Sequence, residues 1–246
     1  MPDRAARDPS AHGSMGRGRP GLSQPKNDDD LLARLPLTIT KSVTQKKRDE
    51  RLSLFHKDQF LLGISSKIAE KLGISEGTLL DASTLSSIRY EEERSEAVTL
   101  GYKLLAIRDH AVGEFERKLR KKGIRRDIVD ACSEAFQKSD LLNDDRFARQ
   151  FVSSKSTLSQ WGPVKLLMEL KKRGISETQA RSALADTFQK EDVEESCIAL
   201  IQKRETHFKR EKDPVKRKQK VFRYLSSKGY TMDVIYRSAE RIEWLP

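Results

Sequence analysis

The sequence has too few cysteine residues for a disulfide framework, and its histidines lie far apart. Cys132 lies four residues from Ile128 and from Phe136, and Cys197 lies four residues from Val193 and from Ile201. This helical spacing predicts two small buried side chains and not redox or metal chemistry. The four histidines match no spacing of zinc ligands; they are His12, His56, His110 and His207. We therefore expect no metal site and no cofactor.

Long apolar runs are also missing. No stretch approaches the roughly 20 residues that a membrane-spanning helix needs. The first residues, M-P-D-R-A-A-R, lack the apolar core of a signal peptide. These absences favour a soluble, cytoplasmic protein.

The acidic residues form no recognisable catalytic arrangement. The pairs Asp144 with Asp145 and Glu194 with Glu195 lie beside expected helix starts, where carboxylates stabilise exposed N–H groups. The glycine-rich stretch G-R-G-R-P-G precedes no strand-to-helix turn, so it is not a phosphate-binding loop. We expect a protein that is not an enzyme.

Positive charge is the main compositional feature. The formal net charge is +11, and 35% of the residues are charged against 36% hydrophobic. This balance suits helices that bury one stripe and solvate the rest. It also favours anionic partners, of which nucleic acid is the most abundant in a cytoplasm. The alternative is that the lysines and arginines only solvate the helices.

One short pattern recurs three times in the second half of the chain. The segments L-R-K-K-G-I, L-K-K-R-G-I and L-S-S-K-G-Y end at Ile124, Ile175 and Tyr230. A glycine in the left-handed conformation just past a helix end would let the next residue pack onto the Leu. The glycines recur at intervals of about 51 and 55 residues, which indicates a repeated structural unit.

The chain is expected to be mainly α-helical, with a tandem array of three three-helix repeats. Expected segments are a disordered tail at 1–35, a small β-rich segment at 36–82, and repeats at 83–140, 141–190 and 191–246. A hairpin should turn at His56, Lys57 and Asp58, and Gly73 should stop a short helix.

Helical spacing predicts the repeats in more detail. Ala97, Leu100, Leu104 and Ile107 form the first apolar stripe of the first repeat. Proline suits the first turn of a helix. Pro163 lies 11 residues before its glycine and Pro214 lies 15 before its own, so the middle helix of the third repeat should be about one turn longer.

The positive charge gathers in two places. Residues 117–126 hold seven Lys or Arg and no acid, and residues 203–223 hold ten against three Asp or Glu. Cations in the last turn of a helix complement the helix dipole. That effect does not explain Arg125 and Arg126, which follow the glycine, or the run from Lys216 to Lys220, which precedes the middle of its helix. We predict contacts with nucleic acid or another anionic partner at Arg117, Lys118, Arg120, Lys121, Arg125, Arg126, Lys216, Arg217, Lys218 and Lys220.

Four aromatic residues lie near these basic runs: Trp161, Phe208, Phe222 and Tyr224. Aromatic rings beside cations are able to stack on bases. Each of the four also falls near a helical apolar stripe or a loop, and core packing is the favoured interpretation. Trp161, just before a Gly-Pro pair, is the least determined of them.

The second repeat carries N-D-D-R-F-A-R-Q-F at 143–151, W-G-P at 161–163 and E-L-K-K-R-G-I at 169–175. With these motifs it resembles the RecX regulators of bacterial RecA. The first and third repeats are similar in E-F-E-R-K-L-R-K-K-G-I and F-R-Y-L-S-S-K-G-Y-T-M-D-V-I, and the likeness covers residues 40–245. Val164 and Lys165 depart from the two arginines that many relatives have after Gly-Pro, which argues against this helix as a main DNA contact.

The resemblance implies tandem three-helix repeats and a regulator that binds the RecA–DNA filament. It also implies modulation, usually inhibition, of recombinase and co-protease activity. The expected partners are the RecA filament and single- and double-stranded DNA with little sequence preference, bound by a monomer that avoids membranes. Two alternatives stay open: a helix-turn-helix repressor that prefers one duplex sequence, and a nucleic-acid enzyme with an unrecognised acidic centre.

Overall fold

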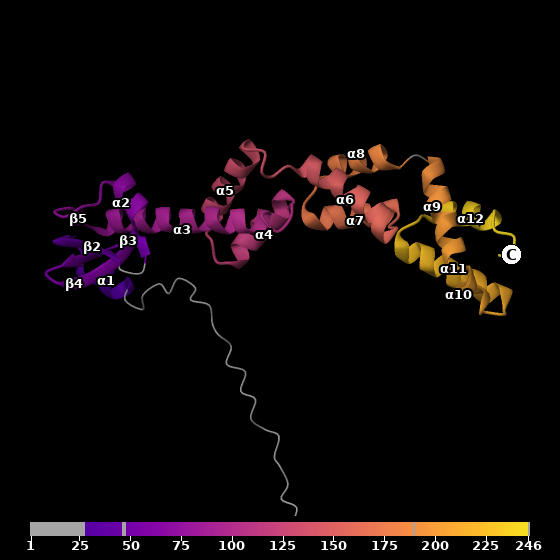
Figure 1. The fold of residues 1–246 in the computed structure, drawn as a ribbon, viewed down its shortest axis with the longest axis horizontal. Helices are drawn as coiled ribbons and strands as arrows, with labels where there is room; N and C mark the ends of the chain where they lie inside the picture. The colour runs from indigo at the N-terminus through magenta and orange to yellow at the C-terminus, as the bar shows by residue number, and fades with distance from the viewer. Residues whose placement is uncertain (1–27, 46–47, 189, 246) are drawn as a thin grey trace, which may run out of the picture. The chain divides into compact units, whose positions relative to one another are not determined.

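The computed structural model describes residues 28–45, 48–188 and 190–245 (Figure 1). The chain divides into two compact units, Met1–Tyr90 and Glu91–Pro246. The long helix α3, Ala82–Leu105, has residues in both. Small antiparallel sheets precede a series of helices, so the predicted mainly α-helical fold is confirmed.

The first unit is built on two small antiparallel sheets. Strands β2 (Lys41–Gln45), β3 (Arg48–His56) and β4 (Gln59–Ser65) form one sheet in that order. The short strands β1 (Leu37–Thr38) and β5 (Leu79–Leu80) form the other. The predicted hairpin is confirmed, since His56 pairs with Gln59 across a turn in which Lys57 and Asp58 have positive φ.

The end of the expected N-terminal tail differs from the prediction. Residues 1–27 lie outside the described residues, but α1 spans Asp28–Arg34. Leu31 is 5% exposed and packs in the same core as Ile39, Leu54 and Ile64. Burial of this leucine offsets the entropy of ordering the segment, so the tail prediction up to residue 35 was wrong for α1.

Helix α2 (Ser66–Leu72) ends where the sequence predicts. Gly73 has φ 66°, and the Ile74 amide donates to the Ala69 carbonyl at 2.8 Å. This is a Schellman motif, in which the left-handed residue turns the chain back onto its own helix.

The helices that follow form three repeats. Repeat 1 contains α3, α4 (Val112–Lys121) and α5 (Arg126–Lys138). Repeat 2 contains α6 (Asp144–Ser159), α7 (Pro163–Arg173) and α8 (Glu177–Thr187). Repeat 3 contains α9 (Lys190–Lys203), α10 (Glu205–Lys209), α11 (Pro214–Lys228) and α12 (Met232–Glu240). The short α10 is an addition to the three-helix plan, and the domain boundaries given above stay a prediction.

The middle helix of each repeat ends as the recurring pattern predicts. Gly123, Gly174 and Gly229 have φ of 90°, 96° and 93°. The amides of Ile124, Ile175 and Tyr230 donate to the carbonyls of Leu119, Leu170 and Leu225 at 3.4, 3.2 and 3.2 Å. All six of these apolar side chains are buried, so each end is fixed by hydrogen bonds and by packing together.

The first turns of the middle helices also follow the prediction. Pro163 and Pro214 are the first residues of α7 and α11, which have 11 and 15 residues. The third repeat therefore has the longer middle helix.

The predicted stripe of α3 was wrong at its end. Ile107 is 80% exposed, because the helix ends at Leu105. Gly101 makes the close contact instead, and a Cβ there would lie 2.9 Å from the Phe136 ring and 3.1 Å from the Phe115 ring. The small residue lets α3 approach the paired rings of the repeat 1 core.

Neighbouring repeats join through the ends of their middle helices. The amides of Gly162 and Val164, at the start of α7, donate to the carbonyls of Lys228 and Gly229 at 2.8 and 3.1 Å. Exposed N–H groups at one helix start thus satisfy unpaired carbonyls at the end of another. Repeats 2 and 3 are therefore joined by backbone N–H and C=O groups that would otherwise form hydrogen bonds with water at the helix ends.

Asp144 and Asp145 lie in the first turn of α6, as predicted, but Asp144 also contacts the preceding repeat. Asp144 accepts a hydrogen bond from the Val112 amide at 2.8 Å, and so caps α4 of the preceding repeat. Burial raises the pKa of Asp144. Glu194 lies inside α9 and pairs with Arg237 and Arg241 at 3.1 and 3.6 Å.

Candidate nucleic-acid interface

Six of the ten predicted contact residues lie on α4 and at the start of α5. Phe115 and Leu119 face the core of repeat 1, which directs the polar positions of α4 away from it. The six are Arg117, Lys118, Arg120, Lys121, Arg125 and Arg126; Lys118 is half-buried and the others are exposed. The amphipathic spacing of α4 accounts for the exposure of the cations on that helix, and Arg125 and Arg126 follow at the start of α5.

Several of these cations have local carboxylate partners. Arg120 lies 3.7 Å from Glu116, and Arg126 lies 3.7 Å from Asp130. Arg125 contacts Glu93 and Asp127 at 3.5 and 2.9 Å. Ion pairs this exposed contribute about 0 to 1 kcal/mol, so a phosphate is able to replace the carboxylate.

Lys121 stands apart from these. Within the described ranges its side chain makes no hydrogen bond or ion pair, and that side chain is exposed. Its position in the last turn of α4 is favourable for a cation. Lys121 is the member of this set that is most available to an anionic partner.

Lys118 belongs to a network around a buried histidine. Its ammonium donates to His110 Nε2 at 2.7 Å, and the other ring nitrogen of His110 donates to the Arg108 carbonyl at 2.9 Å. These partners require a neutral imidazole, with the proton on Nδ1. Burial is the main cause that lowers the pKa of His110, and the Arg108 and Lys118 charges add to it.

Arg117 has a structural role that the sequence did not reveal. Its guanidinium donates to the Lys172 carbonyl at 3.0 Å, two residues before Gly174 in the next repeat. The Lys165 ammonium likewise donates at 3.1 Å to the Ser227 carbonyl, two residues before Gly229. Both cations therefore fix a helix end of the following repeat.

The other four predicted residues lie in the first half of α11: Lys216, Arg217, Lys218 and Lys220. Asp213 caps this helix through the amides of Val215 and Lys216 at 2.9 and 3.2 Å. Lys216 is exposed, whereas the other three are half-buried. Lys220 lies close enough to His207 to be the main cause that lowers the pKa of that imidazole.

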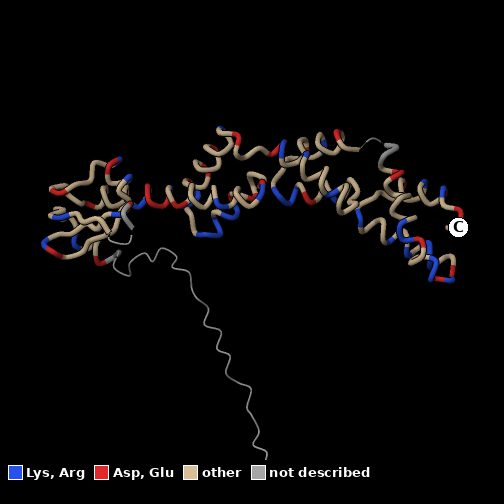
Figure 2. Tube along the Cα trace, viewed as in Figure 1, with Lys and Arg blue, Asp and Glu red and all other residues tan. Residues whose placement is uncertain are grey.

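The two predicted sets do not form one cluster. They belong to repeats 1 and 3, and Figure 2 shows Lys and Arg on the middle helices α4, α7 and α11. The basic surface is thus carried by an equivalent element of each repeat. The sequence did not predict the contribution of repeat 2 to this basic surface. There, Lys165 lies close enough to Lys228 of repeat 3 to lower the pKa of that ammonium.

The aromatic residues serve mainly as core. Phe208 is 1% exposed, which confirms the packing interpretation for it. Trp161, Phe222 and Tyr224 are partly buried against the cores of repeats 2 and 3. Each also has a cation near its ring, such as Lys165 at 4.7 Å from Trp161.

Two further observations bear on the class of protein. No group of three or more His, Cys, Asp or Glu residues is placed to hold a metal ion in the described part of the chain. None of the described helices combines the length and hydrophobicity needed to cross a membrane. The fold and the charge together define a tandem three-helix repeat protein with basic middle helices.

Comparison with known proteins names this class. Residues 143–184 match the family model described as the second three-helix domain of RecX, and residues 191–237 match the third. Regulatory protein RecX of Halalkalibacterium halodurans is 30% identical over 80% of this chain and 75% of its own length. That of Leuconostoc mesenteroides is 28% identical over 83% and 75%. The chain belongs to the RecX family of regulatory proteins, so the predicted resemblance is confirmed.

A solved structure supports the fold. A crystal structure of regulatory protein RecX superposes with a TM-score of 0.65, at 20% identity over 82% of this chain and 98% of the other. At this identity the likeness concerns the fold alone.

Proposed function

We propose that this protein binds a RecA–DNA filament and inhibits its recombinase and co-protease activities. Membership of a family of regulatory proteins supports a regulatory role. The observation that carries the proposal is the series of basic middle helices, one in each repeat. A repeat array of this kind offers an extended surface to a partner that is itself a repeating anion.

The ten predicted residues are proposed as contacts of unequal kinds. Lys121, Arg126 and Lys216 are exposed and would meet phosphates or acidic side chains of the filament directly. Arg117 is already engaged at the junction of repeats 1 and 2, so it contributes both to folding and to the surface potential.

The deciding experiment measures the ATPase activity of RecA on single-stranded DNA while this protein is titrated in. We expect the activity to fall, and strand exchange to fall with it. Unchanged ATPase and unchanged strand exchange at saturating protein would contradict the proposal.

Direct DNA binding is tested by its salt dependence. Contact with about six phosphates of a duplex gives a log-log slope near −5, and random and defined sequences should bind alike. A slope near zero would place the contact on RecA itself. A strong preference for one duplex sequence would favour a repressor, and cleavage of DNA with Mg²⁺ or Mn²⁺ would favour an enzyme.

A further inference from the structure

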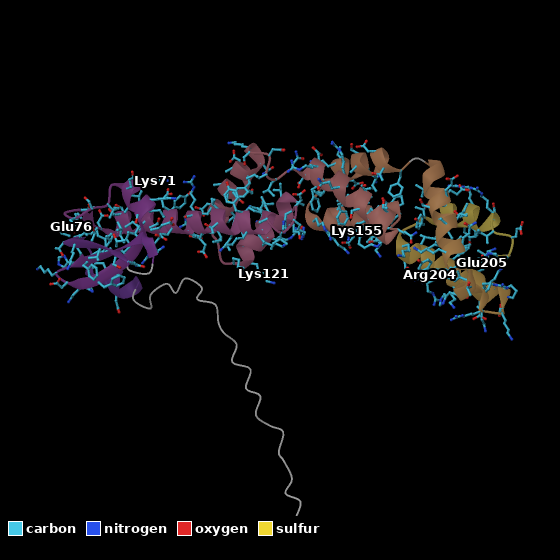
Figure 3. The ribbon with its side chains drawn as sticks, viewed as in Figure 1. Lys71, Glu76, Lys121, Lys155, Arg204 and Glu205 are labelled. Carbon is cyan, nitrogen blue, oxygen red and sulfur yellow. The ribbon has the colours of Figure 1, made fainter. Side chains whose placement is uncertain are left out.

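Cations from repeats 2 and 3 gather where these repeats join. Lys165 is on α7, Lys228 is the last residue of α11, and Arg204 lies between α9 and α10. Figure 3 labels Arg204 in repeat 3 and Lys155 in repeat 2. Lys165 donates to the Ser227 carbonyl at 3.1 Å, and Lys228 donates to the Ser159 carbonyl at 2.9 Å. Each lysine thus holds a carbonyl of the other repeat.

These cations lack compensating carboxylates. Over residues 28–45, 48–188 and 190–245, no acidic side chain pairs with Lys165, Arg204 or Lys228. The acid next to Arg204 in the chain, Glu205, pairs with Lys209 at 2.5 Å. Burial lowers the pKa of Lys228, and the charges of Lys165, Arg204 and Lys203 lower it further. Like charges this close repel one another unless an anion faces them.

The same cations lie against aromatic rings. Arg204 Cζ and Lys228 Nζ are 4.5 and 5.8 Å from the centroid of Tyr224. Lys165 Nζ and Lys155 Nζ are 4.7 and 5.6 Å from that of Trp161. A ring that attracts a cation restricts its position and leaves its N–H groups free to donate. Because both rings are half-buried and already have cations beside them, they suit binding of the backbone and not stacking of bases.

We propose that Lys165, Arg204 and Lys228 form a composite site for phosphate groups of a nucleic-acid backbone, which is complete only when repeats 2 and 3 are docked. An ammonium has three donors, and each lysine uses one on the neighbouring repeat. The remaining ammonium N–H donors and the Arg204 guanidinium suit one kind of ligand, an oxyanion with several acceptor oxygens. This inference rests on the proposed function and names where the DNA is held.

The site couples DNA binding to the docking of the repeats. A phosphate that contacts both lysines binds the docked arrangement and not the separated one, so it stabilises the junction by mass action. The reverse also holds, since a change that weakens docking must weaken phosphate binding. A regulator with this property becomes more rigid when it meets DNA.

The first test compares two double variants with the same change in charge. Lys165→Gln with Lys228→Gln removes the site, whereas Lys41→Gln with Lys67→Gln removes two exposed lysines of the first unit, outside both basic runs. Binding of labelled oligothymidine is followed by fluorescence anisotropy over a range of NaCl concentrations. For the site variant, we expect the slope of log affinity against log NaCl concentration to be about 1.4 less negative than for the unchanged protein. This is the loss of two phosphate contacts to a single strand. Equal slopes for the two double variants would overturn the proposal.

The second test leaves every charge in place. Gly162→Ala puts a methyl group against the end of α11. We expect its affinity for oligothymidine to fall by at least about fivefold, the lower end of ordinary coupling between two sites. Affinity equal to that of the unchanged protein would overturn the coupling.

A third measurement does not depend on altering the site. In a Trp244→Phe variant, Trp161 is the remaining tryptophan, and a phosphate that draws Lys165 away should change its emission. Unchanged emission at saturating oligothymidine would contradict the site. Preferential binding to phosphatidylglycerol vesicles through the same two lysines would replace nucleic acid by a lipid surface and would also overturn it.

Inhibition of RecA, measured in parallel, separates this inference from the proposed function. If the unchanged protein inhibits the RecA ATPase but the two double variants bind oligothymidine alike, only the junction site fails. If the unchanged protein leaves RecA unaffected, the proposed function fails, and the salt slopes still decide the junction site.

Discussion

The carbonyl oxygen of Gly229 occupies the place that a side chain on Gly162 would need, since an added Cβ would lie 2.5 Å from it. The first junction repeats this relationship. A Cβ on Gly113, in the first turn of α4, would lie 3.0 Å from the Arg173 carbonyl and 3.2 Å from Gly174 Cα. Repeats 1 and 2 thus each place a glycine against the helix end of the next repeat, so that the backbones approach closely.

Gly162→Ala should destabilise repeats 2 and 3. The backbone of Gly162 has φ −79°, which alanine adopts freely, so the cost is steric. We expect a loss of about 1–3 kcal/mol in the free energy of unfolding, measured with urea. Gly123→Ala is the control, because its Cβ meets nothing within 4 Å and only its φ of 90° is unfavourable. With Trp244→Phe added to both variants, a Trp161 emission spectrum altered as much by the control would contradict a role at the junction.

Arg117→Gln and Lys121→Gln should separate folding from binding. Arg117 holds the Lys172 carbonyl, so its loss should lower the free energy of unfolding by about 0.5–1.5 kcal/mol as well as weaken DNA binding. Lys121→Gln should weaken DNA binding and leave the urea midpoint unchanged. Equal midpoints for the two variants would show that the Arg117 hydrogen bond adds nothing to stability.

His110 should make the protein less stable in mild acid. In the unfolded chain this imidazole takes up a proton near pH 6.5, whereas burial lowers its pKa in the fold. The unfolded state therefore binds more protons as the pH falls below 6.5, and the free energy of unfolding decreases there. His110→Gln should flatten this dependence in urea titrations between pH 7 and pH 5. A profile as steep as that of the unchanged protein would place the titrating group elsewhere.

The two cysteines should resist alkylation until the protein unfolds. Burial raises the pKa of Cys197 to about 11 and also raises that of Cys132. Thiolate is the reactive form, so modification of Cys197 by iodoacetamide at pH 8 should be at least about a hundredfold slower than that of a free thiol, and modification of Cys132 should also be slowed. Mass spectrometry with and without urea measures this. Rapid labelling of the folded protein would contradict the buried positions of both side chains.

Local signals in the sequence predicted local structure well. The Leu-to-Gly pattern fixed each helix end because its hydrogen bonds and its apolar contact lie within six residues. The junctions were not predictable in this way. Arg117 with Lys172, and Gly162 with Gly229, are 55 and more residues apart, and nothing in their neighbourhood marks them as partners.

The candidate site was predictable in part for the same reason. Runs of charge along one helix identified α4 and α11, because every member is close in sequence. Lys165 is an isolated cation in its stretch of chain and gains its neighbours only through packing. The segment D-L-L-A-R-L at α1 is too short to show a hydrophobic period, so the Pro-, Gly- and Asp-rich composition before it predicted a disordered tail.

Asp213 makes the start of α11 different from the starts of α4 and α7. The starts of α4 and α7 each lie against the end of the next middle helix, whereas the start of α11 is satisfied by this single carboxylate. The Val215 amide, which corresponds to that of Val164 in α7, is thus capped within its own helix and not by a carbonyl of another repeat. A further repeat docked here in the same way would first have to displace the Asp213 carboxylate from that amide.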